Sequence, residues 1–294
     1  MSRRLRRPSI IAALLALAVA LSACGFAVRI GYNQASPLTF RWLDSYVDFD
    51  DAQSLRVRGA LDDWFTWHRR TQLPDYADLL ARARAELHAP ATPERMCFWW
   101  QEIRTRIDTG LERAAPALAE VTPTLTAQQI TNIEKRYAEK NDEYRDDFLH
   151  REPAKRRKAA VKREIERAEL LYGRLDDAQR AFVARSVAQS PWDGDLVYSE
   201  RLHRQQDVLA MLRRLAASRT AVSAADAEIR AYVQRIERSP REDYRRYAER
   251  MADHNCGFAA ALHNLTSAEQ RRVAAQRLKD YEIDLRALAA DAST

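Results

Sequence analysis

Residues 125–148 read LTAQQITNIEKRYAEKNDEYRDDF, and this stretch decides the fold class of the chain. Thr126 followed three residues later by Gln129 is typical of a capping box, in which each side chain satisfies a backbone N–H of the first helical turn. Beyond the box, apolar and aromatic side chains recur at spacings of three, four or seven residues, which place them on one helix face of an otherwise polar segment: Ile130, Ile133, Tyr137, Tyr144 and Phe148. This period predicts a long helix that packs along one narrow seam.

The rest of the chain also indicates helices. Only 7 of the 294 residues are glycine, and no stretch alternates β-branched and polar residues as strands do. We therefore expect an all-α fold, a multi-helix array or bundle of about ten helices. Start and stop signals predict helices over residues 38–49, 50–70, 74–88, 93–115, 126–149, 153–172, 176–190, 195–218 and 223–238, then from Ser239-Pro240, and from Thr266 to residue 289. Pro116 is expected to disrupt the fourth of these helices, and Gly173 to stop the sixth.

The capping pattern recurs in the same order in both parts of the chain. Further instances begin at Asp50, Asp176 and Thr266, and Thr92-Pro93 is echoed by Ser239-Pro240. An internal duplication would give two related halves, residues 38–150 and 151–294. Caps that arose independently would give the same order, so both explanations stay open.

The first 24 residues have the pattern of a bacterial lipoprotein signal. Four arginines (Arg3, Arg4, Arg6 and Arg7) precede twelve apolar residues, 10–21, a length that suits a signal peptide and is too short to span a membrane. Leu21-Ser22-Ala23-Cys24 then reads as a lipobox. We expect residues 1–23 to be a cleaved signal peptide, Cys24 to carry the lipid (palmitate or a similar acyl chain), residues 24–37 to be a tether, and residues 38–294 to form a single helical domain.

Removing the signal changes the charge balance. The whole chain has 48 basic and 42 acidic side chains; four of the basic ones lie before Cys24, so 44 remain against 42 and the net charge falls from +6 to +2. Balanced charge argues against nucleic acid as a partner.

Two cysteines remain once Cys24 is acylated. Cys97 and Cys256 form an even pair in a compartment that favours oxidation, and we expect a disulfide between them. A link over so long a loop would stabilise the fold by about 4–5 kcal/mol in the chain-entropy view. Two separate buried thiols are the alternative.

Segments along nearly the whole mature chain resemble an uncharacterised family of proteobacterial helical lipoproteins, catalogued as a domain of unknown function. The segments include Trp42-Leu43-Asp44, Trp67-His68-Arg69-Arg70, Leu73-Pro74-Asp75-Tyr76, Cys97 with Trp99-Trp100, and Leu171-Tyr172-Gly173-Arg174-Leu175. The resemblance implies lipid anchoring and the cysteine pair, and it implies no catalytic residues. In such lipoproteins an aspartate after the lipidated cysteine favours retention in the inner membrane. This chain has Gly25, so we expect the periplasmic side of the outer membrane, with the periplasmic face of the inner membrane as the alternative.

A weaker resemblance concerns Leu125-Thr126…Gln129 and Leu265-Thr266…Glu269. Both are similar to the LTxxQ motif of Spy-type periplasmic chaperones, which are helical and hold unfolded clients. A capping box explains the same residues without any such relationship.

One charge cluster is a candidate site. Cations are unfavourable in the first turns of a helix, yet six gather there and suggest an anionic partner: Lys155, Arg156, Arg157, Lys158, Lys162 and Arg163. A solvated face paired with Glu164 and Glu166 is the alternative interpretation. His254, Cys256 and His263 could suggest a metal, but no fourth ligand is evident. We expect no metal site, no cofactor and no catalytic residue, since the sequence has no phosphate loop, GxSxG, HExxH or dinucleotide glycine pattern.

These observations favour a non-enzymatic envelope protein with a binding, scaffold or chaperone-like role, facing the periplasm and partnered by the membrane through its lipid and by a protein client. A structural adaptor of an envelope complex and an enzyme with an unfamiliar site are the alternatives. The sequence does not indicate the oligomeric state.

The anchoring prediction is tested by the mass of the protein purified from its native membrane. We expect residues 1–23 to be absent and fatty-acid mass to lie on Cys24, and Cys24→Ser to abolish both processing and acylation. A native protein that keeps Met1, or an unmodified Cys24 thiol, would contradict the prediction.

Overall fold

The computed structural model describes residues 29–149 and 152–291, so Cys24 and the proposed signal peptide lie outside the described residues. All regular structure in this part is helical, which confirms the all-α prediction. No helix in it is long and apolar enough to cross a bilayer. The helices are α2 Ala35–Val47, α3 Asp51–Trp67, α4 Leu73–Glu86, α5 Pro93–Val121, α6 Ala127–Phe148, α7 Pro153–Tyr172, α8 Asp177–Gln189, α9 Gly194–Ser218, α10 Val222–Glu237, α11 Glu242–Leu265 and α12 Ala268–Ala290, with a π-turn η1 His68–Gln72 and a 3-10 turn η2 Thr122–Thr124.

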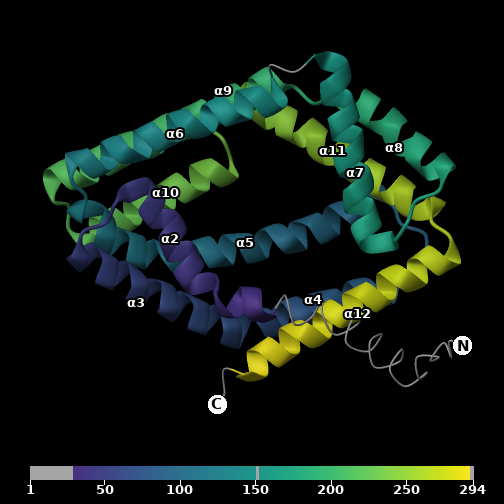
Figure 1. The fold of residues 1–294 in the computed structure, drawn as a ribbon, viewed down its shortest axis with the longest axis horizontal. Coiled ribbons are helices and arrows are strands. Elements are labelled where there is room, and N and C mark those ends of the chain that lie inside the picture. The colour runs from purple at the N-terminus through teal and green to yellow at the C-terminus, as the bar shows by residue number, and fades with distance from the viewer. Residues whose placement is uncertain (1–28, 150–151, 292–294) are drawn as a thin grey trace, which may run out of the picture.

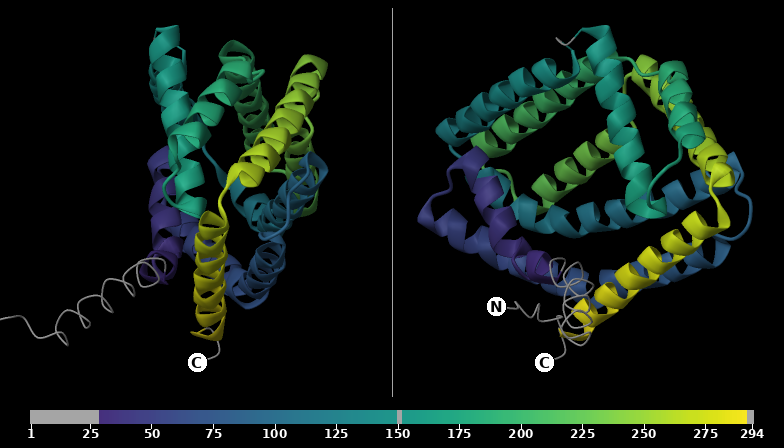
Figure 2. Two further views of the ribbon diagram at one scale, coloured as in Figure 1. Left: turned by 90° about the vertical axis from the view of Figure 1, so that its right-hand side faces the viewer. Right: turned by 45° about the vertical axis from the view of Figure 1, so that its right-hand side comes forward.

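The helices form the sides of a frame (Figure 1). α6 and α9 pack along one edge, and α3, α4 and α12 lie along the opposite edge. α7, α8 and α11 close a third side, while α5 and α10 cross between the edges. The side view in Figure 2 places α2 and α7 on one face of the frame, the face seen in Figure 1.

Three expected helix signals are wrong. Pro116 does not disrupt α5, which continues to Val121, because Ala115 and Ala119 on either side of the exposed proline are fully buried and packing outweighs one lost hydrogen bond. Ser239 does not open α11; its hydroxyl accepts from the Arg241 N–H in the preceding turn.

Thr266 does not cap α12. Its hydroxyl donates to the His263 carbonyl at 2.6 Å and so completes the end of α11. The N-cap of α12 is instead Ser267, whose Oγ accepts from the Gln270 N–H at 3.1 Å. The expected stop at Gly173 is confirmed, since this residue follows α7 with φ of +75°.

Two capping boxes meet at the junction of α3 and α6. Gln53 closes the box of Asp50, and Gln129 closes the box of Thr126. The two buried amides also bond each other: Gln129 Nε2 donates to Gln53 Oε1 at 2.6 Å, and Gln53 Nε2 donates to Gln129 Oε1 at 3.2 Å. Each amide then donates to the backbone carbonyl two residues before the other cap, Gln53 to Thr124 and Gln129 to Asp48.

The same arrangement occurs at the junction of α8 and α12. Gln179 closes the box of Asp176, Gln270 closes the box of Ser267, and the two amides bond each other at 2.8 and 2.9 Å. Again each donates to the carbonyl two residues before the other cap, Leu265 and Arg174. We name the pairs Gln53–Gln129 and Gln179–Gln270 the glutamine clasps. Each clasp satisfies helix-end N–H groups and ties together segments far apart in the sequence.

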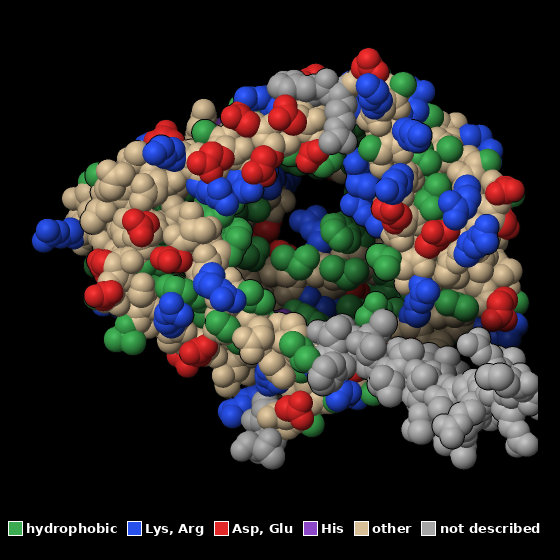
Figure 3. Space-filling view, in the orientation of Figure 1, with side chains coloured by type: hydrophobic (Ala, Val, Ile, Leu, Met, Phe, Trp, Pro, Cys, Tyr) green, Lys and Arg blue, Asp and Glu red, His purple; other side chains and the backbone are tan. Residues whose placement is uncertain are grey.

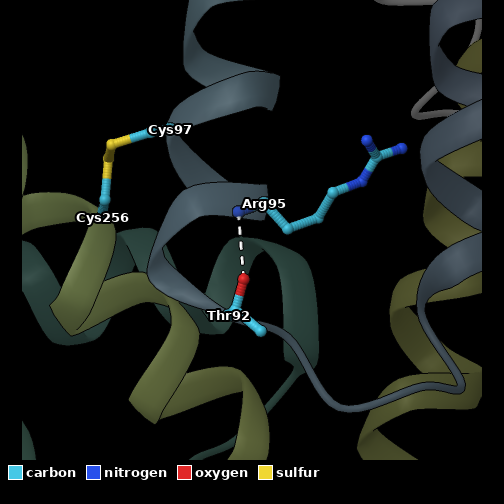
Figure 4. The surroundings of a disulfide bond; sticks show 4 residues. All are labelled: Thr92, Arg95, Cys97 and Cys256. Atoms are coloured by element: carbon cyan, nitrogen blue, oxygen red, sulfur yellow. Dashed lines mark hydrogen bonds between the residues drawn. A yellow bond between two sulfur atoms is a disulfide. The ribbon is translucent and has the colours of Figure 1, made fainter.

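A disulfide joins α5 to α11. Cys97 and Cys256 are bonded, with their Cα atoms 5.3 Å apart, as the sequence predicts (Figure 4). Thr92, one turn before Cys97, accepts from the Arg95 N–H and fixes the start of α5. The pairing of α4 with α12 forms a second link between early and late segments, with ion pairs of Arg84 to Glu282 and Arg286 to Asp78.

His68 lies in the short π-helix η1 between α3 and α4. The chain therefore stays helical through residue 70, where the sequence predicted that the helix would end. Its Nδ1 is 2.8 Å from the Tyr32 hydroxyl, its ring stacks on Trp64, and Tyr76 meets it edge-on. Burial in this aromatic cage lowers the pKa of His68 from 6.5 to about 4. The imidazole is therefore neutral at pH 7.

The clasp prediction concerns two neighbouring glutamines. Gln129→Ala leaves the buried Gln53 amide without its partner and should lower the free energy of unfolding by about 2 kcal/mol. Gln128→Ala is the matched control, because Gln128 is exposed on the first turn of the same helix, and should change it by less than about 0.5 kcal/mol. Urea unfolding measures both; equal effects would contradict the role given to the clasp.

The His68 cage predicts a pH dependence. Because the folded-state pKa is lowered, the unfolded chain binds the proton first, so stability is full above pH 6.5 and falls as the pH drops towards 4. At pH 5 the loss should be roughly 1–2 kcal/mol. His68→Phe should remove this part of the slope, whereas His88→Gln, at an exposed histidine, should not. Identical slopes for the wild type and His68→Phe in unfolding at pH 5 to 7 would overturn the assignment.

Candidate functional site

One face of α5 exposes large apolar side chains. Five of them recur at helical spacing and form what we call the α5 stripe: Trp100, Ile103, Ile107, Leu111 and Leu118, with 39–52% of their surface exposed. Residues 100 to 118 span about 27 Å along the helix. Isolated exposed apolar residues are ordinary, but a contiguous row of this length indicates a binding surface.

The flanking contacts explain why the stripe is open. On one side of α5, the Trp64 indole donates to the Gly110 carbonyl at 3.0 Å, and a Cβ at Gly110 would meet the Trp64 ring at 3.4 Å, so α3 approaches closely there. The other side packs against α10 and α11, and a disulfide bonds Cys97 on α5 to Cys256 on α11. α5 is thus held along both flanks, and no described helix covers the face between them.

The space-filling view shows the surroundings of α5 on the face seen in Figure 1. The face in Figure 3 is hollowed between the α6–α9 edge and α5, and hydrophobic side chains gather in the hollow over α5. Lys and Arg side chains lie beneath the edge formed by α6 and α9.

Carboxylates crowd the flank of the stripe next to α10. Burial raises the pKa of Glu237 at the end of α10, and the nearby charges of Asp108 and Glu112 on α5 raise it further, while Arg104 opposes them. This flank would gain from a cationic neighbour.

The predicted basic cluster on α7 divides into two groups. Lys155, Lys158 and Lys162 line one shallow concavity with Ala159 and Ile165. Lys155 also pairs with Glu152 at 3.4 Å, and Lys162 with Glu166 at 3.6 Å, which supports the solvated-face interpretation for these two.

The other members serve the α6–α7 junction or face solvent. Arg156 donates to the Phe148 carbonyl, and the Arg163 guanidinium lies 5.3 Å over the Phe148 ring. Arg157 is exposed. The six cations therefore do not form one continuous anion site.

The structure explains Cys256 and His263 without a ligand. The Cys256 sulfur is in the disulfide, and both ring nitrogens of His263 are in hydrogen-bond range of other groups, the Tyr172 hydroxyl and the Ala89 carbonyl. Within the described residues, no group of three or more His, Cys, Asp or Glu side chains is placed to hold a metal.

Two sets of side chains were missed in the sequence. The spacing of the α5 stripe is visible there, but spacing alone does not show whether an apolar helix face is exposed or covered. A group of tyrosines and arginines on α2, α6, α9, α10 and α11 gave no local signal, because only the fold brings it together.

Comparison with known proteins gives one match. A family of unknown function, DUF6279, matches residues 45–245, which is more than half of the chain. No curated protein and no solved structure matches. The chain therefore belongs to the DUF6279 family.

Proposed function

We propose that this protein is a lipid-anchored envelope protein that binds an apolar-faced polypeptide helix on the α5 stripe, in a non-enzymatic, chaperone-like role. Cys24 would hold it to the membrane, at the periplasmic side of the outer membrane. The observation that carries the proposal is the row of exposed apolar side chains on a helix that is fixed along both flanks.

The geometry of the stripe favours a helical occupant. Apolar residues three and four positions apart on one helix accept the complementary ridge of a second helix, as in other recognition of amphipathic helices in apolar grooves. A partner of about 18 residues would cover the length of the stripe.

The charge beside the stripe favours basic residues on that partner. Asp108, Glu112 and Glu237 form an acidic flank, and a lysine or arginine next to the partner's apolar face would relieve the repulsion between them. The proposed ligand class is therefore a basic amphipathic helix, such as a segment of an incompletely folded protein.

The test uses a labelled 18-residue peptide with leucine on one face and lysine on the other. We expect it to bind the purified protein by fluorescence anisotropy, and a leucine–glutamate peptide of the same pattern to bind more weakly. Ile107→Glu, in the middle of the stripe, should weaken binding at least tenfold. Thr109→Glu, on an exposed position of the same helix outside the stripe, is the matched control and should leave the affinity unchanged.

Equal loss of binding in Ile107→Glu and Thr109→Glu would overturn the location of the site. If neither peptide binds the wild-type protein, the proposed function itself is overturned.

A further inference from the structure

A second hollow lies at the inner side of α9 and is independent of the α5 stripe. Its volume is about 370 Å³, and its wall is formed mainly by polar and aromatic side chains from α2, α6, α9, α10 and α11. This size suits a small organic ligand.

Two arginines one helical turn apart line this hollow, and hydrogen bonds and ring contacts hold both guanidinium groups in place. Arg201 donates through Nε to Asn141 Oδ1 at 2.7 Å, and its guanidinium lies 5.3 Å over the Tyr144 ring. Arg204 donates through Nε to Glu200 Oε1 at 2.7 Å, and lies 5.5 Å over the Tyr244 ring. Among the described residues, neither has an acceptor for its terminal nitrogens, and these are the atoms that bind a carboxylate in bidentate fashion.

One oxygen of a buried carboxylate in the same wall lacks a hydrogen-bond donor. Glu200 is 2% exposed, and while its Oε1 accepts from Arg204, no described residue donates a hydrogen bond to its Oε2, which lies 3.7 Å from the Arg241 guanidinium. A buried oxygen left in this way is costly, and a hydroxyl donor from a ligand would remove the cost.

Aromatic rings supply the remaining surface. Tyr46, Tyr137 and Tyr232 line the hollow together with Tyr244. The negative faces of such rings attract the weakly positive C–H groups of a saccharide ring.

We propose that this hollow binds an anionic saccharide of the sugar-acid class. Its carboxylate lies on the terminal nitrogens of Arg201 and Arg204, a ring hydroxyl donates to Glu200 Oε2, and the saccharide ring packs on the tyrosines.

Isothermal titration of the purified protein with D-glucuronate tests this site. The comparison probes are D-glucose, which lacks the carboxylate, and acetate, which lacks the ring and its hydroxyls. We expect glucuronate to bind and the other two to bind at least tenfold more weakly. Arg201→Gln should weaken glucuronate binding about tenfold to a hundredfold. Arg213→Gln, at an exposed arginine on the same helix outside the hollow, should leave it unchanged.

Failure of glucuronate to bind the wild type, or equal affinity in Arg201→Gln and Arg213→Gln, would overturn the site. Acetate binding as tight as that of glucuronate would overturn the assignment to a saccharide. Glu200→Gln keeps the shape of the wall and weakens the acceptor, so it should reduce glucuronate affinity more than acetate affinity. Leucine–lysine peptide binding should be unaffected by Arg201→Gln, which separates this site from the α5 stripe.

Discussion

Paired glutamine amides at two helix junctions fix the corners on which the rest of this fold depends. In each clasp, both glutamines use both polar atoms of the amide. Each Oε1 accepts from the backbone N–H of its own cap residue, and each Nε2 donates to the opposite amide oxygen and to a backbone carbonyl. Gln53, Gln129 and Gln179 are buried and Gln270 is half-buried, so the bonds act in a medium of reduced dielectric constant, where a missing partner is costly. These polar contacts add to the apolar packing beside each junction, which includes Leu125 and Ile130 at the first and Leu175 at the second.

The apolar core is accordingly distributed. Within the described residues, many of the buried apolar side chains belong to four separate clusters, the largest formed by parts of α5, α6, α9 and α10. The Cys97–Cys256 disulfide and the α4–α12 pair then connect early and late segments across the frame. This arrangement leaves one face of α5 open, and the hollow lined by Glu200 and Arg201 shares no residue with it. The identical bonding of the two clasps, with matching offsets to the carbonyl acceptors, also supports the duplication that the sequence left open.

Local signals predicted the helices well, whereas the long-range relations, apart from the Cys97–Cys256 disulfide, could not be predicted. The boxes at Asp50, Thr126 and Asp176 are confirmed because a capping box involves only four neighbouring residues. Thr266 and Ser267 are both good caps, and the choice depended on the His263 carbonyl at the end of α11. The stripe on α5 has the same periodicity as a core face, because a sequence shows that a helix face is apolar but not whether another helix covers it. Arg201 and Tyr46 are more than 150 residues apart in the chain, so no spacing rule could join them.

The most direct test of the account asks whether the α5 stripe is open in the free protein and covered when a helix binds. In a chain carrying Cys24→Ser and Ile107→Cys, the native Cys97–Cys256 pair leaves one free thiol, at position 107. The account predicts rapid labelling of this thiol in the free protein and protection by the leucine–lysine peptide. A thiol that reacts slowly before the peptide is added, or equally fast after saturation with it, would contradict the account.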